Sequence, residues 1–257
     1  MFYLQPGELY CSVRLRKLFV ISSLNGIIIA MDQIISTAAP AAAAVVIALF
    51  ALPSYIGLIR QKGWLKALGM VVVIGAILLA VQAAAIRFTF PFGDFSFGDA
   101  LGYKLFGLVP WAVAFAYTPL VLATFWLSSK LTKNGFRVVL AGLFLAASNV
   151  VLDPALAFMG LRSWENGGPF YGVPILNFGG WLLTGLITAC VLHAMWGKED
   201  SVGRSVAYSG FAIVWFWGGV NLGLKQWVPG GIGIAIGVLI LVLMSIERRR
   251  QKKAKDD

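Results

Sequence analysis

The sequence predicts an all-α fold, a polytopic membrane helix bundle of about eight transmembrane helices (seven is the alternative), with both termini in the cytoplasm. Of the 257 residues, 59% are hydrophobic and only 12% are charged, and the mean hydropathy is +0.83. Soluble domains are about half apolar and roughly a quarter charged. This chain therefore lacks the polar residues needed to cover a surface exposed to water.

The spans are predicted from apolar runs, because a helix needs about 20 apolar residues to cross the hydrocarbon. Two runs are short: the first extends past Asp32 to about Thr37, and the fifth past Asp153 to about Phe158. We expect residues 1–247 to form one transmembrane domain and residues 248–257 a basic cytoplasmic tail. The eight runs are Leu18–Met31, Ala41–Ile59, Ala67–Ile86, Leu105–Leu127, Val138–Leu152, Pro174–Met195, Val206–Leu224 and Gly230–Ile246.

The N-terminal run has a second interpretation, a cleaved signal peptide. Arg14, Arg16 and Lys17 precede the apolar stretch, and small residues follow at Ser36–Ala39. However, Asp32 follows the apolar core and another spanning run begins at once, so a retained first span is favoured.

The loop charges predict the orientation. If the spans alternate, one side receives only four of the 21 Lys and Arg residues, namely Arg87, Lys104, Arg162 and Lys225. By the positive-inside rule the other side is cytoplasmic, which predicts a multi-pass protein of the cytoplasmic (inner) cell membrane. The net charge of +10 lies largely in such clusters and in the tail Glu247–Asp257, so we expect contact with anionic lipid headgroups and no nucleic-acid partner.

The residue inventory argues against metal and nucleotide chemistry. There is one histidine, His193, and two widely separated cysteines, Cys11 and Cys190. These provide no spacing for a zinc, di-iron or haem site. A glycine-rich nucleotide motif, a P-loop and a nucleophile elbow are also lacking. We therefore expect no metal and no cofactor.

Polar residues inside the apolar runs gather at one membrane depth, near the predicted outer side. Asn149 and Asp153 are four residues apart on one helix face, and Gln82 lies near the end of an earlier span. An intramembrane charge costs on the order of 3 kcal/mol and is a functional candidate. The alternative is that the amides join helices and that Asp153-Pro154 is a helix end in water.

Two long non-helical stretches fall on the same side, Arg87–Lys104 and Met159–Val173. Both are rich in glycine, proline and aromatic residues. They are either interfacial anchors or structured loops that cover a site.

The motifs in and beside these stretches resemble a known family. They are Phe90-Pro91-Phe92-Gly93, Leu101-Gly102, Val109-Pro110-Trp111, Leu152-Asp153-Pro154, Trp164, Tyr171-Gly172-Val173-Pro174 and Asn177-Phe178-Gly179-Gly180-Trp181. In this order they resemble the carotenoid-biosynthesis membrane hydratases, the family of gamma-carotene 1',2'-hydratase and bisanhydrobacterioruberin hydratase. The resemblance runs from about Gln82 to Gly185.

The resemblance implies the addition of water to the terminal C1=C2 bond of an acyclic carotenoid, a long apolar polyene, without a cofactor. Asp153 would protonate C2, and aromatic faces would stabilise the tertiary cation at C1. Asn149 and Asn177 would hold the water, and Asp94 or Glu165 would return a proton to solvent. The implied catalytic residues are Asp153, Asn149 and Gln82, and the implied substrate-binding residues are Phe90, Phe92, Asp94, Trp111, Trp164, Glu165, Tyr171, Asn177 and Trp181.

The chain departs from the family pattern at three positions. The family often has a Glu at Gln82, an Asp at Asn149 and an aromatic residue at Arg162. An amide keeps the hydrogen bonds of a carboxylate but cannot deliver a proton. Two other classes therefore stay open: a non-catalytic carotenoid- or lipid-binding membrane protein, and a small transporter, for which the sequence offers no convincing inverted repeat.

Overall fold

A computed structural model describes residues 41–132, 134–197 and 202–256 of the chain. The helices in these ranges are Ala41–Lys62, α2 (Trp64–Phe88), α3 (Ala112–Leu131), α4 (Phe136–Phe158), α5 (Ile175–Trp196), α6 (Tyr208–Gly223) and α7 (Trp227–Asp256). Six of them are long and apolar enough to cross a membrane, and α6, with 16 residues, is the exception. The predicted all-α, multi-pass membrane bundle is thereby confirmed.

Other expectations are not settled by these helices. The first predicted span, Leu18–Met31, and its signal-peptide alternative lie outside the described residues. The orientation of the bundle, the membrane in which it resides and headgroup binding by the tail stay predictions. The same holds for the boundary between residues 1–247 and 248–257, although α7 continues as helix to Asp256.

The fourth predicted span begins later than its apolar run. Residues 104–110 instead form a hairpin of β2 (Lys104–Leu105) and β3 (Val109–Pro110), and α3 starts at Ala112. Phe106 and Gly107 adopt φ angles of 52° and 69° in the turn, which a helix does not tolerate. Hydropathy alone cannot separate such an apolar hairpin from a helix.

The fifth span continues past Asp153 to Phe158, as its predicted extension required, and includes Pro154. Carbonyl groups near this proline receive donors from neighbouring elements: Asn221 Nδ2 donates to the Val151 oxygen at 2.7 Å and Gln226 Nε2 to the Pro154 oxygen at 3.4 Å. These bonds satisfy backbone in a segment where lipid offers no partner. The end of α4 is therefore held by α6 and the turn that follows it.

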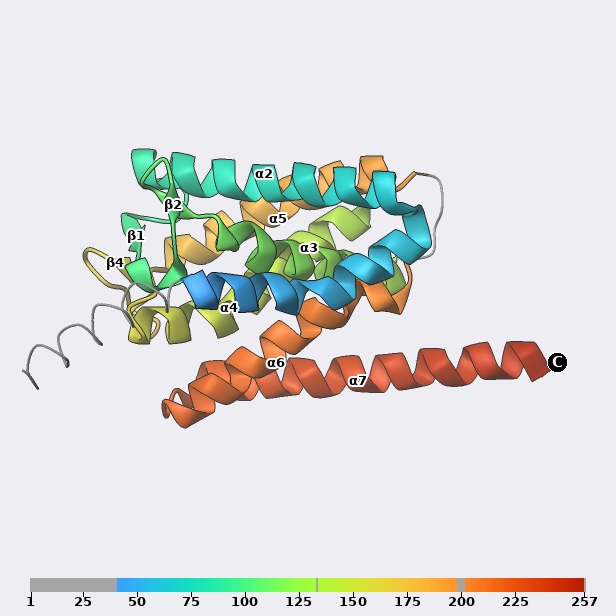
Figure 1. Cartoon of the computed structure of the whole chain (residues 1–257). Coiled ribbons are helices and arrows are strands. Elements are labelled where there is room, and N and C mark those ends of the chain that lie inside the picture. The colour runs from blue at the N-terminus through green and yellow to red at the C-terminus, as the bar shows by residue number, and fades with distance from the viewer. Residues whose placement is uncertain (1–40, 133, 198–201, 257) are drawn as a thin grey trace, which may run out of the picture.

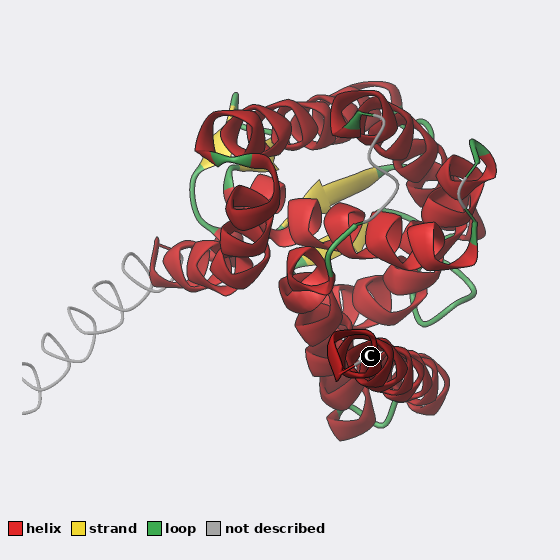
Figure 2. Ribbon diagram, turned by 90° about the vertical axis from the view of Figure 1, so that its right-hand side faces the viewer, coloured by secondary structure: helices red, strands yellow, loops and turns green. Residues whose placement is uncertain are grey.

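The helices run roughly along one direction, and both long loops lie at the same end of the bundle (Figure 1). We call this the loop end. Seen along the helices, the short strands lie behind them at that far end (Figure 2). Helix α4 packs most extensively against α5, and α6 against α7. The α4–α5 contact is close because Gly142 and Gly185 face each other: a Cβ atom on Gly185 would lie 2.7 Å from the Gly142 Cα.

The two long loops are joined by a short antiparallel pair, β1 (Phe95–Phe97) with β4 (Arg162–Trp164). Phe95 faces Trp164 and Phe97 faces Arg162 across the pair. In both strands the outer residues are buried and the central serine is exposed, as strand geometry requires. The loops are thus structured and form one cover over the loop end, rather than separate interfacial anchors.

The close α4–α5 contact gives a first prediction. Gly185→Ala is expected to lower stability by about 1–3 kcal/mol, because the added methyl group meets the backbone of α4. Gly179→Ala in the same helix is the matched control, since a Cβ there has open space. The midpoint of thermal unfolding in detergent measures both, and equal midpoints for the two variants would contradict the close contact.

Candidate functional site

Asp153 lies at the centre of the polar residues of the loop end. It sits in the last turns of α4, and its side chain has no exposed surface. Its Oδ2 accepts hydrogen bonds from Asn177 Nδ2 at 2.6 Å and from Trp181 Nε1 at 2.7 Å, both on α5. Its Oδ1 lies 3.4 Å from Nη1 of Arg162. Helix α5 thus holds one oxygen firmly, and the β4 arginine makes a longer contact with the other.

Arg162 joins this centre to α2. Its side chain is also fully buried, and its Nη2 donates to Oε1 of Gln82 at 3.3 Å. A buried carboxylate and a buried guanidinium each carry a desolvation cost of several kcal/mol, which their mutual attraction and added hydrogen bonds must offset. The structure brings together the two predicted residues Gln82 and Asp153, and the link between them is a residue that the prediction left outside the site.

Five aromatic rings surround the Arg162 guanidinium and form what we call the aromatic cage. The guanidinium carbon lies 4.0 to 5.5 Å from the centres of these rings, which is within cation–π range. The rings also support one another: Trp164 Nε1 donates to the Phe92 carbonyl at 3.0 Å, and Phe92 meets Trp181 edge to face at 5.2 Å. The cage residues are Phe92, Phe95, Phe97, Trp164 and Trp181.

Other predicted residues lie outside this centre. Asn149 is fully buried, but its Nδ2 donates to the Leu145 carbonyl of its own helix at 2.9 Å. Trp111 packs edge to face on Phe115, with ring centres 5.4 Å apart. Phe90 and Tyr171 are 62% and 38% exposed. Among the described residues, none of these side chains forms a hydrogen bond with Asp153 or a cage residue, and their predicted roles stay predictions.

Asp94 and Glu165 form an exposed acidic pair on the cover. The Glu165 backbone N–H donates to the Asp94 carbonyl at 3.2 Å, beside the β1–β4 pair. A hydrogen bond between the two carboxyl groups and the charge of Asp94 raise the pKa of Glu165. Because the pKa is raised in the folded protein, this contact holds at acidic pH and weakens as the pH rises through that pKa. Both residues are exposed on the surface of the cover.

Sequence reasoning missed Arg162, Phe95 and Phe97 as members of the site. One signal was available: Phe95-Ser96-Phe97 and Arg162-Ser163-Trp164 both alternate large and small side chains, which is the strand period of two. Arg162 is also one of only four basic residues on the side that is poor in them. What the sequence did not contain was the pairing of two three-residue strands that lie far apart in the chain.

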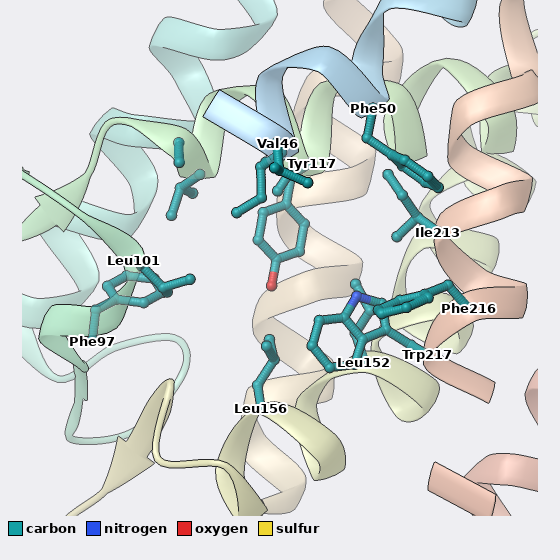
Figure 3. Close-up of a pocket in the computed structure, with 14 residues that line it drawn as sticks. Val46, Phe50, Phe97, Leu101, Tyr117, Leu152, Leu156, Ile213, Phe216 and Trp217 are labelled. Carbon is teal, nitrogen blue, oxygen red and sulfur yellow. The ribbon is translucent and has the colours of Figure 1, made fainter. Parts of the chain in front are cut away.

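An apolar cavity of about 240 Å³ adjoins the cage (Figure 3). It lies between the helix Ala41–Lys62, α3, α4 and α6, and Leu152, Leu156 and Trp217 are among the residues that line it. Phe97 belongs both to its wall and to the cage. Tyr117 also lines it and stacks on the cage residue Trp181, with ring centres 4.4 Å apart. Among the described residues, no group of three His, Cys, Asp or Glu side chains is placed to hold a metal ion.

Comparison with known proteins finds similar sequences. The profile of a family described as carotenoid biosynthesis protein matches residues 36–240. The chain is also 31% identical over 172 residues to bisanhydrobacterioruberin hydratase of Haloarcula japonica, a match that covers 63% of this chain and 58% of the relative. The chain thus spans less than two thirds of that relative's length. No solved structure shows significant similarity to it.

The buried ion pair gives a second prediction. Arg162→Met is expected to destabilise the protein by about 3–5 kcal/mol, because it leaves Asp153 buried without its charged partner. The double variant Arg162→Met/Asp153→Asn is expected to recover part of this loss, since neither charge then remains. Thermal unfolding in detergent measures the cycle.

The control for this cycle is Lys104→Met, which breaks an exposed pair with Asp99, 2.7 Å apart, and is expected to change stability little. The cycle also includes the single variant Asp153→Asn. If the double variant loses as much stability as the two single variants added together, the two charges do not interact.

Proposed function

The chain belongs to the carotenoid biosynthesis protein family, and we propose that it is a cofactor-independent carotenoid hydratase, which adds water to the terminal C1=C2 bond of an acyclic carotenoid. One observation carries the proposal. A fully buried carboxyl group is held by three hydrogen-bond donors, and Leu152, next to it in α4, lines an apolar cavity among apolar helices long enough to span a membrane. Such a place suits a polyene that lives in the bilayer and reacts at its end.

Hydration requires a proton donor and a water molecule, and Asp153 is the proposed donor. In the forward step the proton of the carboxyl group goes to C2, and a tertiary cation forms at C1. The oxygen of water then bonds to C1, and the proton that it releases returns to Asp153. Asn177 and Trp181 hold Oδ2, which leaves Oδ1, with its longer 3.4 Å contact to Arg162, as the oxygen that exchanges the proton.

The two amides have supporting roles in this proposal. Gln82 accepts a hydrogen bond from Arg162 and so helps to fix the guanidinium beside Asp153. Asn149 lies one turn before Asp153 on α4 and is fully buried. Neither side chain can deliver a proton. The proton leaves Asp153 and returns to it in each cycle. We therefore propose that Asp94 and Glu165 only exchange this proton with solvent.

A second candidate function is carotenoid binding without catalysis, and one observation favours it. The faces of the aromatic cage that would stabilise a cation at C1 already surround the guanidinium of Arg162. With these ring faces occupied by Arg162, the protein would bind the polyene in the bilayer without hydrating it.

The test is expression in a host that accumulates lycopene or bisanhydrobacterioruberin, with mass spectrometry for products heavier by one water. We expect such a product from the wild-type chain. Asp153→Asn is expected to lower its yield by at least about 100-fold, because an amide cannot protonate C2.

The control is Asp99→Asn, which changes an exposed carboxylate in the same cover and is expected to leave the yield unchanged. Full activity of a folded Asp153→Asn variant would refute the mechanism. Failure of the wild-type chain to convert either substrate, with the protein present in the membrane, would favour the binding function.

A further inference from the structure

The aromatic cage is filled by the protein itself. The guanidinium carbon of Arg162 lies 4.0 Å from the centre of the Phe95 ring and 4.9 Å from that of Trp164, and its side chain has no exposed surface. A substrate end group cannot contact the same ring faces unless this arginine leaves. Leaving would expose Asp153 to the apolar interior without its partner, at a cost of several kcal/mol. The end group of a substrate must therefore bind beside the cage and not within it.

The cavity in Figure 3 is the adjoining space, and its walls are almost entirely aliphatic and aromatic. Its volume of about 240 Å³ is below the roughly 300–1,000 Å³ of sites that enclose a whole drug-sized ligand. It suits one end of a long polyene, while the rest of the polyene extends past the helix Ala41–Lys62 and α6. Val46, Phe50 and Phe216 line the cavity on these helices and are 61%, 44% and 58% exposed in the part of the chain that the structure describes.

Tyr117 places one polar atom in this cavity. Its side chain is only 4% exposed, and Figure 3 shows its hydroxyl pointing into the cavity towards Leu152 and Leu156. Within the described residues this hydroxyl has no hydrogen-bond partner. A buried hydroxyl without a partner is costly, and a ligand or a water molecule in the cavity would satisfy it.

Tyr117 also connects the cavity with the charged centre. Its ring stacks on Trp181, whose indole N–H donates to Asp153 Oδ2 at 2.7 Å. Its hydroxyl also lies near Arg162, but without the geometry of a hydrogen bond. Asp153 itself does not line the cavity, whereas Tyr117 lines it and contacts Trp181, a hydrogen-bond donor to Asp153.

We propose that this cavity is the end-group site of the polyene and that Tyr117 is a catalytic residue that delivers to C2 the proton of Asp153. Because the Tyr117 hydroxyl forms no hydrogen bond with Asp153 itself, the proposal includes one water molecule that relays the proton between them. The Tyr117 hydroxyl gives its proton to C2 as it takes a proton from this water molecule, which in turn takes the proton of the Asp153 carboxyl group. Water then bonds to C1, and the proton that it releases returns to the Asp153 carboxylate, so that both residues end as they began. This inference rests on the proposed hydratase function and identifies where its substrate binds.

The first experiment fills the cavity. Ala116→Phe on α3 places a ring in the proposed end-group site, and Ala116→Leu fills it less in case the larger variant is not recovered. The matched control is Ala147→Phe on α4, because Ala147 lines a separate apolar cavity of about 220 Å³ and is likewise half-buried. Each protein is purified from the carotenoid-accumulating host, and bound pigment and hydrated product are measured for the same amount of protein.

We expect the Ala116 variants to lose at least about tenfold in both bound pigment and product, and Ala147→Phe to match the wild type. Wild-type levels of pigment in Ala116→Phe would overturn the inference, as would a wild-type chain that binds no pigment. If the wild-type chain binds pigment but forms no product, the hydratase function fails. In that case, pigment binding by the Ala116 variants still tests whether this cavity holds the end group of the polyene.

The second experiment removes one oxygen atom. Tyr117→Phe is expected to retain pigment binding and to lower the product by at least about 100-fold, the range for a lost proton-transfer group. Tyr55→Phe is the control, since Tyr55 packs on Phe115 and lies outside the cavity lining. Wild-type product yield in Tyr117→Phe would overturn the role of the hydroxyl. Loss of pigment together with product would show that Tyr117 serves binding instead of proton transfer.

Discussion

Asp153 and Arg162 form an ion pair in which neither side chain has any exposed surface, and the loop end of the bundle is arranged around it. The desolvation cost of the pair must be offset by the groups around it, although Arg162 Nε has no hydrogen-bond partner among the described residues. Helix α5 provides two donors to the carboxylate, α2 provides an amide oxygen to the guanidinium, and the cover provides aromatic faces. The glycine contact between α4 and α5 brings Asp153 within reach of its donors. The β1–β4 pair brings Arg162 down onto the helices. A change at any of these points therefore acts on the others through the buried charges.

The sequence was sufficient for the parts of this arrangement that follow from local rules. Apolar runs of about 20 residues predict helices because lipid satisfies no backbone polar group. Gln82 and Asp153 could be placed at one depth because helix rise and loop charges set the depth of each residue. The i,i+4 spacing of Asn149 and Asp153 was correct as geometry, yet Asn149 bonds to its own helix. The spacing places a residue on a face but does not say what its side chain bonds to.

The rest depended on contacts between segments that are distant in the chain. Strands of three residues such as Phe95–Phe97 carry too little periodic signal to be recognised alone, and their pairing sets the position of Arg162. From sequence, an arginine in a loop is expected to be solvated. Only the tertiary structure shows that Arg162 is enclosed by five aromatic rings. The late start of α3 has a local origin, because the β2–β3 hairpin spans only residues 104–110. The apolar hairpin before Ala112 is as hydrophobic as the helix, and a turn with positive φ angles separates them.

The resident guanidinium also bears on the chemistry proposed for this site. To act as the proton donor, the carboxylate of the ion pair first takes up a proton, and in this acid form Asp153 is neutral while Arg162 carries the positive charge of the centre. After transfer, the carboxylate lies beside Arg162 and the new positive charge lies on the polyene in the adjoining cavity. The total charge is unchanged. The cation therefore forms next to the charge-neutral Asp153–Arg162 ion pair rather than next to an unpaired guanidinium. The same pair that makes the cage unavailable to substrate thus removes the like-charge repulsion at the moment the cation appears. This electrostatic coupling requires the cation to form beside the cage, which is where the cavity and the Tyr117 hydroxyl lie.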